Sequence, residues 1–251
     1  MVDKKIIPAE KFYDSISDIY EKMIDFEKNL ELRIDAYKNI FPATGNLLDI
    51  GCGIGLDSIA LSKNGHTVTA IDISPKMIEE LNINAQKYQV NINSSIGSFD
   101  SISKKLNASF DYIISVGNTI AHLNPIELKS AVKKIYTKLK CGGKLFLHIL
   151  NYDMILKENK RINNIASRDG KIIIRFYDFE KFEIRFNILS FSADSPKEHS
   201  LVTTTHYSHS KSLINKYLKA SGFRKIRFAG NFSGEKYSER NSKDLFVEAV
   251  K

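Results

Sequence analysis

Three glycines lie close together directly after an apolar run, in the stretch LLDIGCGIG that begins at Leu47. Glycine loses more conformational freedom on folding than any other residue, so it is costly in regular structure. Gly51, Gly53 and Gly55 therefore indicate a backbone that turns tightly or lies against a ligand. If a helix follows, its first N–H groups favour a polar or anionic group at the same place.

An acidic residue, Asp72, follows this loop in the stretch AIDIS, at a spacing of about twenty residues that is typical of ribose recognition. A carboxylate there can accept hydrogen bonds from both ribose hydroxyls. The alternative is a charge that only complements a helix N-terminus, although Ser74 already supplies an N-cap. A dinucleotide fingerprint would need glycine where Leu56 stands, and the pattern is instead D-x-G-x-G-x-G from Asp49. We therefore favour a ribose-containing ligand.

Alternating strands and helices must position these residues. Helical periodicity covers residues 9–41, after which Pro42 and Gly45 break it. The expected strands are 46–50, GHTVTAIDIS, 90–96, FDYIISVG and KLFLHIL, and the expected helices between them are 56–64, one opened by Ser74-Pro75, and 125–139. This alternation is typical of an α/β fold with a doubly wound, mostly parallel sheet covered on both faces.

The texture of the sequence changes after Leu150. Residues 171–178, 181–191 and 200–209 are β-rich and partly alternating, which predicts an antiparallel meander added to the main sheet. The expected organisation is an N-terminal helical lid and ligand-binding core at 1–150, a β-rich insertion covering the acceptor site at 151–210, and a last helix and strands completing the core at 211–251.

Composition limits the function classes. The 251 residues indicate one large domain, or one domain with an insertion, and the net charge of +8 comes from scattered lysines and arginines. Nucleic acid is therefore an unlikely partner. Neither cysteine has zinc-ligand spacing, so we expect no metal. The N-terminal stretch MVDKKIIPAEKFYDS has no apolar targeting region and no run approaches a membrane span, so we expect a cytoplasmic protein without membrane contact.

A resemblance to a known family makes the expected ligand and function more specific. LLDIGCGIGLDSIALSKNGHTVTAIDISPKMI resembles motif I and the acidic motif of class I S-adenosylmethionine-dependent methyltransferases. VGNTIAHL, NYDMIL and LRIDAYK are similar to segments of the glycine N-methyltransferase group of small-molecule enzymes. The resemblance implies a Rossmann-like, seven-stranded sheet with an antiparallel β insertion after strand 5. It also implies S-adenosylmethionine as cofactor, S-adenosylhomocysteine as product, and a small-molecule acceptor methylated at an amine nitrogen.

The resemblance also assigns a cofactor site. Arg33 would pair with the methionine carboxylate, because a guanidinium fork suits a carboxylate. The other implied contacts follow the cofactor from its methionine part through its ribose to its adenine: Gly51, Cys52 and Gly53, then Asp72, Ile73 and Met77, then Ser98, Phe99 and Asp100, with Val116 near the sulfonium. Met77 and Phe99 could equally be core residues.

On the acceptor side, the resemblance points to Asn118 and His122 as the catalytic candidates. The Asn118 side-chain oxygen would contact the acceptor and orient an amine, and His122 would be a base or a structural residue. Four further side chains are candidates for covering the acceptor, since aromatic faces attract a sulfonium: Tyr13, Tyr20, Tyr207 and His209.

One departure from the family bears on the acceptor. Glycine-methylating relatives carry H-R-N-Y-D, whose arginine holds the acceptor carboxylate, whereas this chain has ILNYD with Leu150 in the arginine position. Leucine cannot pair with a carboxylate, and an unpaired buried charge is costly. Glycine and sarcosine are therefore not the expected acceptors, and an uncharged or amine-bearing molecule is better supported.

Two other function classes stay open. An RNA methyltransferase would give the positive charge a purpose, although GNTIAHL stands where an N-P-P-Y-type motif would be expected. A non-catalytic module that senses S-adenosylmethionine is the third. The sequence leaves the acceptor, the methylated atom and a homodimer undecided.

Overall fold

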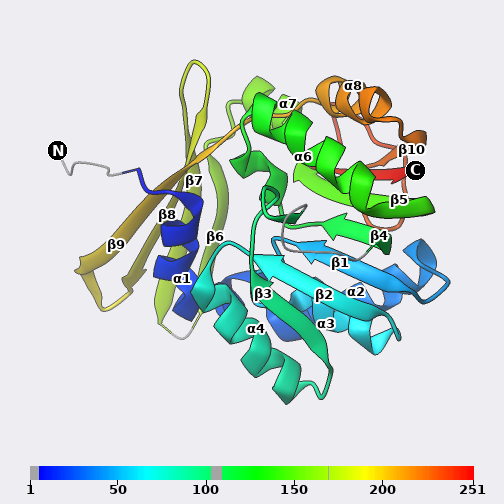
Figure 1. Ribbon diagram of the computed structural model, residues 1–251. Coiled ribbons are helices and arrows are strands. Elements are labelled where there is room, and N and C mark those ends of the chain that lie inside the picture. Colours follow the sequence, from blue (N-terminus) through cyan, green and yellow to red (C-terminus); the bar gives the residue numbers. More distant parts are fainter. Residues whose placement is uncertain (1–5, 103–108, 169) are drawn as a thin grey trace.

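The computed structural model describes residues 6–102, 109–168 and 170–251, and it contains two β-sheets (Figure 1). The larger sheet has seven strands in the order β10-β11-β5-β4-β1-β2-β3, and the smaller has four in the order β6-β7-β8-β9. All pairings in the larger sheet are parallel except those of β11 with β5 and β10. The predicted fold class, a mostly parallel seven-stranded sheet with an antiparallel insertion after strand 5, is confirmed.

The larger sheet takes its strands from both ends of the chain: β1 (Asn46–Ile50), β2 (Thr67–Asp72), β3 (Ile92–Ile96), β4 (Phe110–Ser115), β5 (Leu139–Leu150), β10 (Arg224–Ala229) and β11 (Asp244–Val250). The smaller sheet is continuous in sequence: β6 (Ile162–Arg168), β7 (Lys171–Phe179), β8 (Ile184–Ser192) and β9 (Ser195–His206). The helices are α1 (Ala9–Ile24), α2 (Phe26–Ile40), α3 (Leu56–Lys63), α4 (Pro75–Lys87), the short η1 (Thr119–His122), α6 (Pro125–Lys138), α7 (Tyr152–Lys157) and α8 (Lys211–Ser221).

The strand order reverses between β1 and β4, which creates the switch point where ligands bind in this type of sheet. Right-handed crossovers then place α3 and α4 on one face and α6 on the other. The loops after β1 and β4 consequently diverge at the carboxyl edge of the sheet. This divergence opens the space that the glycine-rich loop borders.

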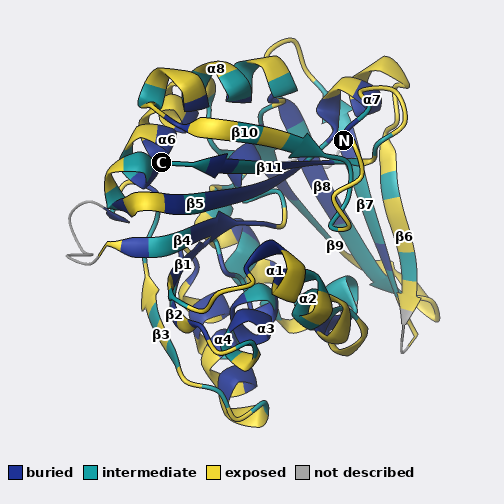
Figure 2. Ribbon diagram, turned by 90° about the vertical axis from the view of Figure 1, so that its right-hand side faces the viewer, coloured by how far each residue is buried: buried dark blue, intermediate teal, exposed yellow. Residues whose placement is uncertain are grey.

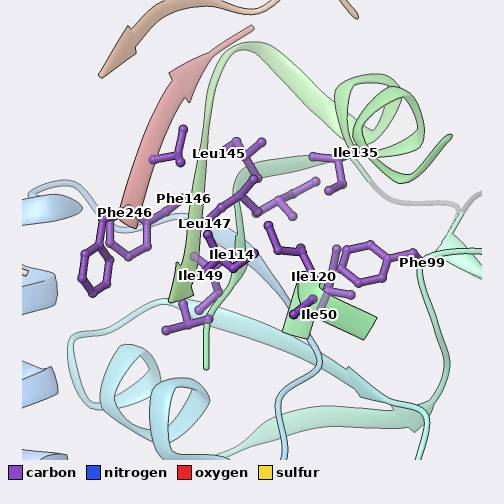
Figure 3. Packing of buried hydrophobic residues seen from close by; sticks show 14 of the residues in the cluster. Ile50, Phe99, Ile114, Ile120, Ile135, Leu145, Phe146, Leu147, Ile149 and Phe246 are labelled. Carbon is purple, nitrogen blue, oxygen red and sulfur yellow. The ribbon is translucent and has the colours of Figure 1, made fainter. Parts of the chain in front are cut away.

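The core lies around the central strands of the larger sheet. Leu145, Leu147 and Ile149 of β5 are fully buried, and Figure 3 shows them packed with side chains from neighbouring elements such as Ile114 and Ile135. Burial differs between central and edge strands: much of β5 and β11 is buried, whereas the edge strand β6 is mostly exposed (Figure 2). The rigid central strands therefore support the loops at their carboxyl ends.

The smaller sheet packs on the N-terminal helix rather than extending the larger sheet. Phe12 of α1 contacts Phe186 of β8, with ring centroids 5.7 Å apart, and both belong to the main hydrophobic core. The N–H of Ile7 donates to the carbonyl of Thr203 in β9 at 2.9 Å. In Figure 1, α1 lies between the two sheets. The insertion and α1 thus form one cover over the edge of the larger sheet.

Three local features differ from the sequence expectation. The predicted N-terminal helix is two helices, because Asp25 adopts a left-handed conformation with φ of 51°. The insertion has four strands in a sheet of their own, not three added to the main sheet. The helix α7 follows β5, where none was predicted, and Asn151 caps it by accepting from the N–H of Met154.

The first five residues of the N-terminal stretch examined above lie outside the described residues. No helix among those the structure describes is long and apolar enough to cross a membrane.

Candidate active site

The glycine-rich loop joins β1 to α3, and all three of its glycines have positive φ, between 52° and 93°. A Cβ added to Gly51 would lie 2.3 Å from the Thr119 Cγ2, so the loop packs against the segment after β4. Gly53 differs, because a Cβ there would meet nothing closer than the Tyr20 ring at 3.7 Å. The backbone of Gly53 therefore faces open space, as the sequence predicts for a loop that receives a ligand.

Asp72 ends β2 beside this loop and is held by two backbone donors. Its Oδ2 accepts from the Gly53 N–H and its Oδ1 from the Ser74 N–H, each at 2.9 Å. Burial raises the pKa of Asp72, and these N–H groups oppose that shift by stabilising the carboxylate. Each oxygen keeps a lone pair for a further donor. The carboxylate is thus oriented in advance for two ligand hydroxyls.

A cavity of about 430 Å³ lies between the glycine loop, α1 and the segments after β3 and β4. This volume falls in the range of small-ligand pockets. Most of the residues predicted for the site line this one cavity: Tyr13, Tyr20, Arg33, Gly51, Cys52, Gly53, Asp72, Ile73, Ser98, Phe99, Asp100, Val116 and His122. The topology therefore brings together residues from six separate segments of the chain.

Arg33 of α2 is one of the residues that line the cavity. Its guanidinium lies over the Phe232 ring, 3.8 Å from the centroid, and its Nε is 3.0 Å from the Asp57 Oδ1. The Tyr37 hydroxyl also donates to this Asp57 oxygen at 2.6 Å. Stacking and pairing hold the guanidinium in place, so it is available to a carboxylate at the cavity end.

A buried carboxyl group, Asp49, lies beneath the loop. The Ser58 hydroxyl donates to its Oδ2 at 2.6 Å. Burial, reinforced by the nearby Asp57 charge, raises the pKa of Asp49 to about 8. The group is consequently protonated at neutral pH and adds no second negative charge beside Asp57.

Tyr13 of α1 and His122 of η1 form a pair that lines the cavity. The Tyr13 hydroxyl is 3.0 Å from the His122 Nε2, and the ring centroids are 5.4 Å apart. Burial lowers the pKa of His122 to about 4 and raises that of Tyr13. Both groups are therefore neutral at physiological pH. The Tyr13 hydroxyl keeps one hydrogen-bonding position beyond its bond to His122, and the pair adds no net charge to the cavity.

Asn118 has a different environment from the acceptor contact that the sequence predicts. Its side-chain oxygen accepts from the Leu150 N–H at 3.1 Å, and its Nδ2 donates to the Tyr152 hydroxyl at 2.9 Å. Since that hydroxyl accepts from Asn118, it donates to the His206 Nδ1, 3.0 Å away. Asn118 thus joins the end of β4 to β5, α7 and the insertion, and it does not line the cavity.

Three other predicted residues also lie outside the cavity. Met77 is fully buried in the core, as its alternative reading allowed. The backbone N–H of Tyr207 donates to the Ala121 carbonyl, and the His209 Nε2 is 2.9 Å from the Leu123 carbonyl. These two residues tie the end of the insertion to the segment after β4. They fix the position of the segment that carries His122.

Sequence reasoning did not single out Thr119, Asp57, Tyr152 or His206. Thr119 and Asp57 line the cavity, and Tyr152 and His206 form the hydrogen-bonded layer next to it. His206 also stacks on Phe186 and meets His122 edge to face, at 4.5 Å between centroids. Only the position of Asp57 in the first turn after the glycines gave a local signal. The others depend on contacts between distant segments.

The sequence is similar to those of known methyltransferases. Residues 47–143 match the family model described as "Methyltransferase domain". A glycine/sarcosine N-methyltransferase from Parasynechococcus marenigrum is 27% identical over 165 residues, covering 64% of this chain and 57% of that enzyme. Human glycine N-methyltransferase is 32% identical over 124 residues, covering 44% and 42% of the two chains. The chain therefore matches about half of the length of these relatives.

Solved structures agree on the fold. The crystal structure of an S-adenosylmethionine-dependent methyltransferase from Clostridium acetobutylicum superposes with a TM-score of 0.75 at 19% identity, covering 95% of this chain and 98% of that one. Residues 47–143 thus match a methyltransferase domain, and the chain as a whole has the fold of that S-adenosylmethionine-dependent methyltransferase. The cofactor of this class is S-adenosylmethionine.

The residues present fit this cofactor. Its two ribose hydroxyls match the oriented Asp72 carboxylate, and its methionine carboxylate matches the Arg33 guanidinium. The open face of Gly53 gives the room that a side chain would occupy.

Proposed function

We propose that this protein transfers a methyl group from S-adenosylmethionine to an amine nitrogen of a small molecule. The observation that carries the proposal is the neutral Tyr13–His122 pair, which shares one cavity with the predicted cofactor residues. The cavity of about 430 Å³ falls in the range of small-ligand pockets, and α1 lines one side of it. The name of the Parasynechococcus relative, an N-methyltransferase for glycine and sarcosine, supports nitrogen as the methylated atom.

The bound cofactor would supply a methyl group on a sulfonium, which leaves as a neutral thioether. The protein has to align the acceptor lone pair with that bond and exclude water. Asp72 and Arg33 would fix the two ends of the cofactor. Val116 and Gly51 border the space between those ends, so the acceptor would approach over the loops after β1 and β4.

An amine must be unprotonated when it attacks. The burial that lowers the pKa of His122 to about 4 would also disfavour an ammonium ion in the same cavity, because desolvation penalises the charged form. The acceptor would then bind as the neutral amine. The Tyr13 hydroxyl, held by the His122 Nε2 at 3.0 Å, would orient it through a hydrogen bond, and the proton of the methylated product would leave for solvent.

Label transfer tests this proposal. Methyl-labelled S-adenosylmethionine is offered with host extract that has been separated into a small-molecule fraction and an RNA fraction. With the natural chain we expect label in the small-molecule fraction. With the double variant Tyr13→Phe, His122→Phe we expect at least tenfold less label there. Label in RNA would overturn the small-molecule acceptor. Tight cofactor binding with no label in either fraction would favour the non-catalytic module.

A further inference from the structure

A chain of hydrogen bonds next to the cavity has no part in the mechanism described so far. The Leu150 N–H donates to the Asn118 Oδ1 at 3.1 Å, and the Asn118 Nδ2 donates to the Tyr152 hydroxyl at 2.9 Å. That hydroxyl lies 3.0 Å from the His206 Nδ1. Because the chain starts at a backbone N–H, which can only donate, every proton in it is directed toward His206. Burial lowers the pKa of His206 well below its ordinary value, so the ring is neutral and carries its proton on Nε2.

His206 is fixed in position at the end of β9. Its ring stacks on that of Phe186, with centroids 4.7 Å apart and 16° between the planes. The next residue, Tyr207, donates its N–H to the Ala121 carbonyl at 2.7 Å, which joins this end of β9 to η1. The His122 ring of η1 meets the His206 ring edge to face, with 4.5 Å between centroids and 85° between planes. The orientation of His206 therefore determines the surface against which His122 packs.

The neutral His122 ring carries one proton, and its surroundings decide which nitrogen holds it. Nε2 lies 3.0 Å from the Tyr13 hydroxyl. Burial lowers the pKa of His122 to about 4, and the Thr205 carbonyl opposes this fall, as a carbonyl that attracts a ring N–H does. Since Nε2 faces Tyr13, the nitrogen that this carbonyl favours for the proton is Nδ1. Nδ1 makes no full hydrogen bond with a described residue, so the attraction depends on how the ring is oriented.

The position of this proton decides what Tyr13 can do for an amine. With the proton on Nδ1, the His122 Nε2 accepts from the Tyr13 hydroxyl, and the Tyr13 oxygen is free to accept an N–H of the amine. With the proton on Nε2, the ring donates to the Tyr13 oxygen, and the hydroxyl proton turns to the amine lone pair. A lone pair engaged in that bond is not available to the methyl group. Methyl transfer to nitrogen therefore needs the first arrangement.

We propose that His206 is a positioning residue, which keeps the His122 ring in the orientation that places its proton on Nδ1. Tyr152 and Asn118 hold His206 in turn. His206 does not line the cavity and acts only through His122. This inference rests on the proposed function, and it gives Asn118 a role at a distance in place of the acceptor contact expected from the sequence.

Nitrogen-15 NMR of the histidine rings, in the protein loaded with S-adenosylhomocysteine, shows which nitrogen of each ring is protonated. We expect His122 to be protonated on Nδ1 and His206 on Nε2, each signal being assigned by its loss in His122→Asn or His206→Phe. Tyr152→Phe removes only the hydroxyl, and His206→Phe keeps a flat ring. In both variants we expect a second His122 signal, with the proton on Nε2. His199→Phe replaces an exposed histidine of the same strand and is the matched control that should leave His122 unchanged.

Two results would overturn the inference. One is a natural chain in which His122 carries its proton on Nε2. The other is an unchanged His122 signal in Tyr152→Phe and His206→Phe, in samples that thermal unfolding shows to be folded. If His206→Phe does not fold, Tyr152→Phe decides alone, because it removes one oxygen atom and keeps the ring.

The rate of label transfer to the small-molecule fraction of host extract separates positioning from a purely structural role. We expect Tyr152→Phe and His206→Phe to be at least tenfold slower than the natural chain, with an affinity for S-adenosylhomocysteine within twofold by calorimetry. The double variant should be no slower than His206→Phe, because both substitutions break one chain. Natural rates in the single variants would overturn the positioning role. If the natural chain transfers no label to small molecules, the proposed function fails instead, and the NMR result still decides the orientation of His122.

Discussion

Replacing Asp72 by asparagine tests the cofactor site at its most constrained point. The substitution keeps the size and shape of the side chain but removes its charge and turns one oxygen into an NH₂ group. Both carboxylate oxygens accept backbone N–H groups at 2.9 Å, from Gly53 and Ser74. The NH₂ group must therefore face one of these donors or rotate away from it. Either result disturbs the orientation that favours a ribose.

The expected loss follows from the bonds removed. A hydrogen bond to a charged group contributes about 1.5–3 kcal/mol, and one such bond to a ribose hydroxyl is lost while the other is weakened. The total of about 2–4 kcal/mol corresponds to a rise in the dissociation constant between about 30-fold and about 1,000-fold.

Isothermal titration calorimetry with S-adenosylhomocysteine measures this change directly. Asp35→Asn is a suitable control, because Asp35 is an exposed carboxylate on α2 that pairs with Lys38 on the surface. We expect the control to bind as the natural chain does. Equal affinity of Asp72→Asn, in a sample whose thermal unfolding shows it to be folded, would refute the assignment of Asp72 to the ribose.

Three further substitutions probe other parts of the site. Gly51→Ala should lower the free energy of unfolding in urea by about 1–3 kcal/mol, because its φ is +75° and the new Cβ would lie 2.3 Å from the Thr119 Cγ2; an unchanged midpoint would contradict this packing. Asp49→Asn should flatten the pH dependence of stability. Its folded pKa of about 8 exceeds the ordinary 3.8, so the unfolded chain binds fewer protons and stability falls between pH 4 and pH 8, by at most about 1.4 kcal/mol per pH unit. If the natural chain instead gains stability relative to Asp49→Asn as the pH rises from 4 to 8, the pKa of Asp49 is not raised in the folded state. His122→Asn should lower turnover. Because His122, with a pKa of about 4, is already neutral between pH 6 and 7, the substitution should leave any inflection of the kcat/KM profile in this range unchanged. An inflection that the substitution abolishes would show His122 titrating near its ordinary pKa.

The fold was predictable wherever local signals and topology agreed. Alternating strands and helices, the glycine loop and Ser74-Pro75 each indicate the parallel sheet, and the structure confirms it. The break at Asp25 was not predictable, because the helical periodicity continues across it and only one residue leaves the helical region. The separate four-stranded sheet was also missed, since alternation predicts strands without saying which neighbours they pair with.

Site residues close to the glycine loop could be predicted from spacing, and those across the cavity only from the resemblance. Asp72 follows a strand at the expected distance from the loop. Asn118 shows the limit: its place after β4 is the expected one, yet its oxygen accepts from Leu150 and its amide reaches Tyr152. His206 gave no sequence signal, because its hydrogen bond to Tyr152 and its ring contact with His122 form only once the insertion has packed beside the segment after β4.

The most direct test of the central claim is the identity of the bond that the methyl group forms. The protein would be incubated with S-adenosylmethionine labelled with carbon-13 in its methyl group and with the small-molecule fraction of host extract, and the product examined by proton–carbon correlation NMR and mass spectrometry. We predict a labelled N-methyl group on a small amine, with one S-adenosylhomocysteine formed for each methyl transferred. Label on oxygen, carbon or sulfur, or on RNA alone, would contradict the account.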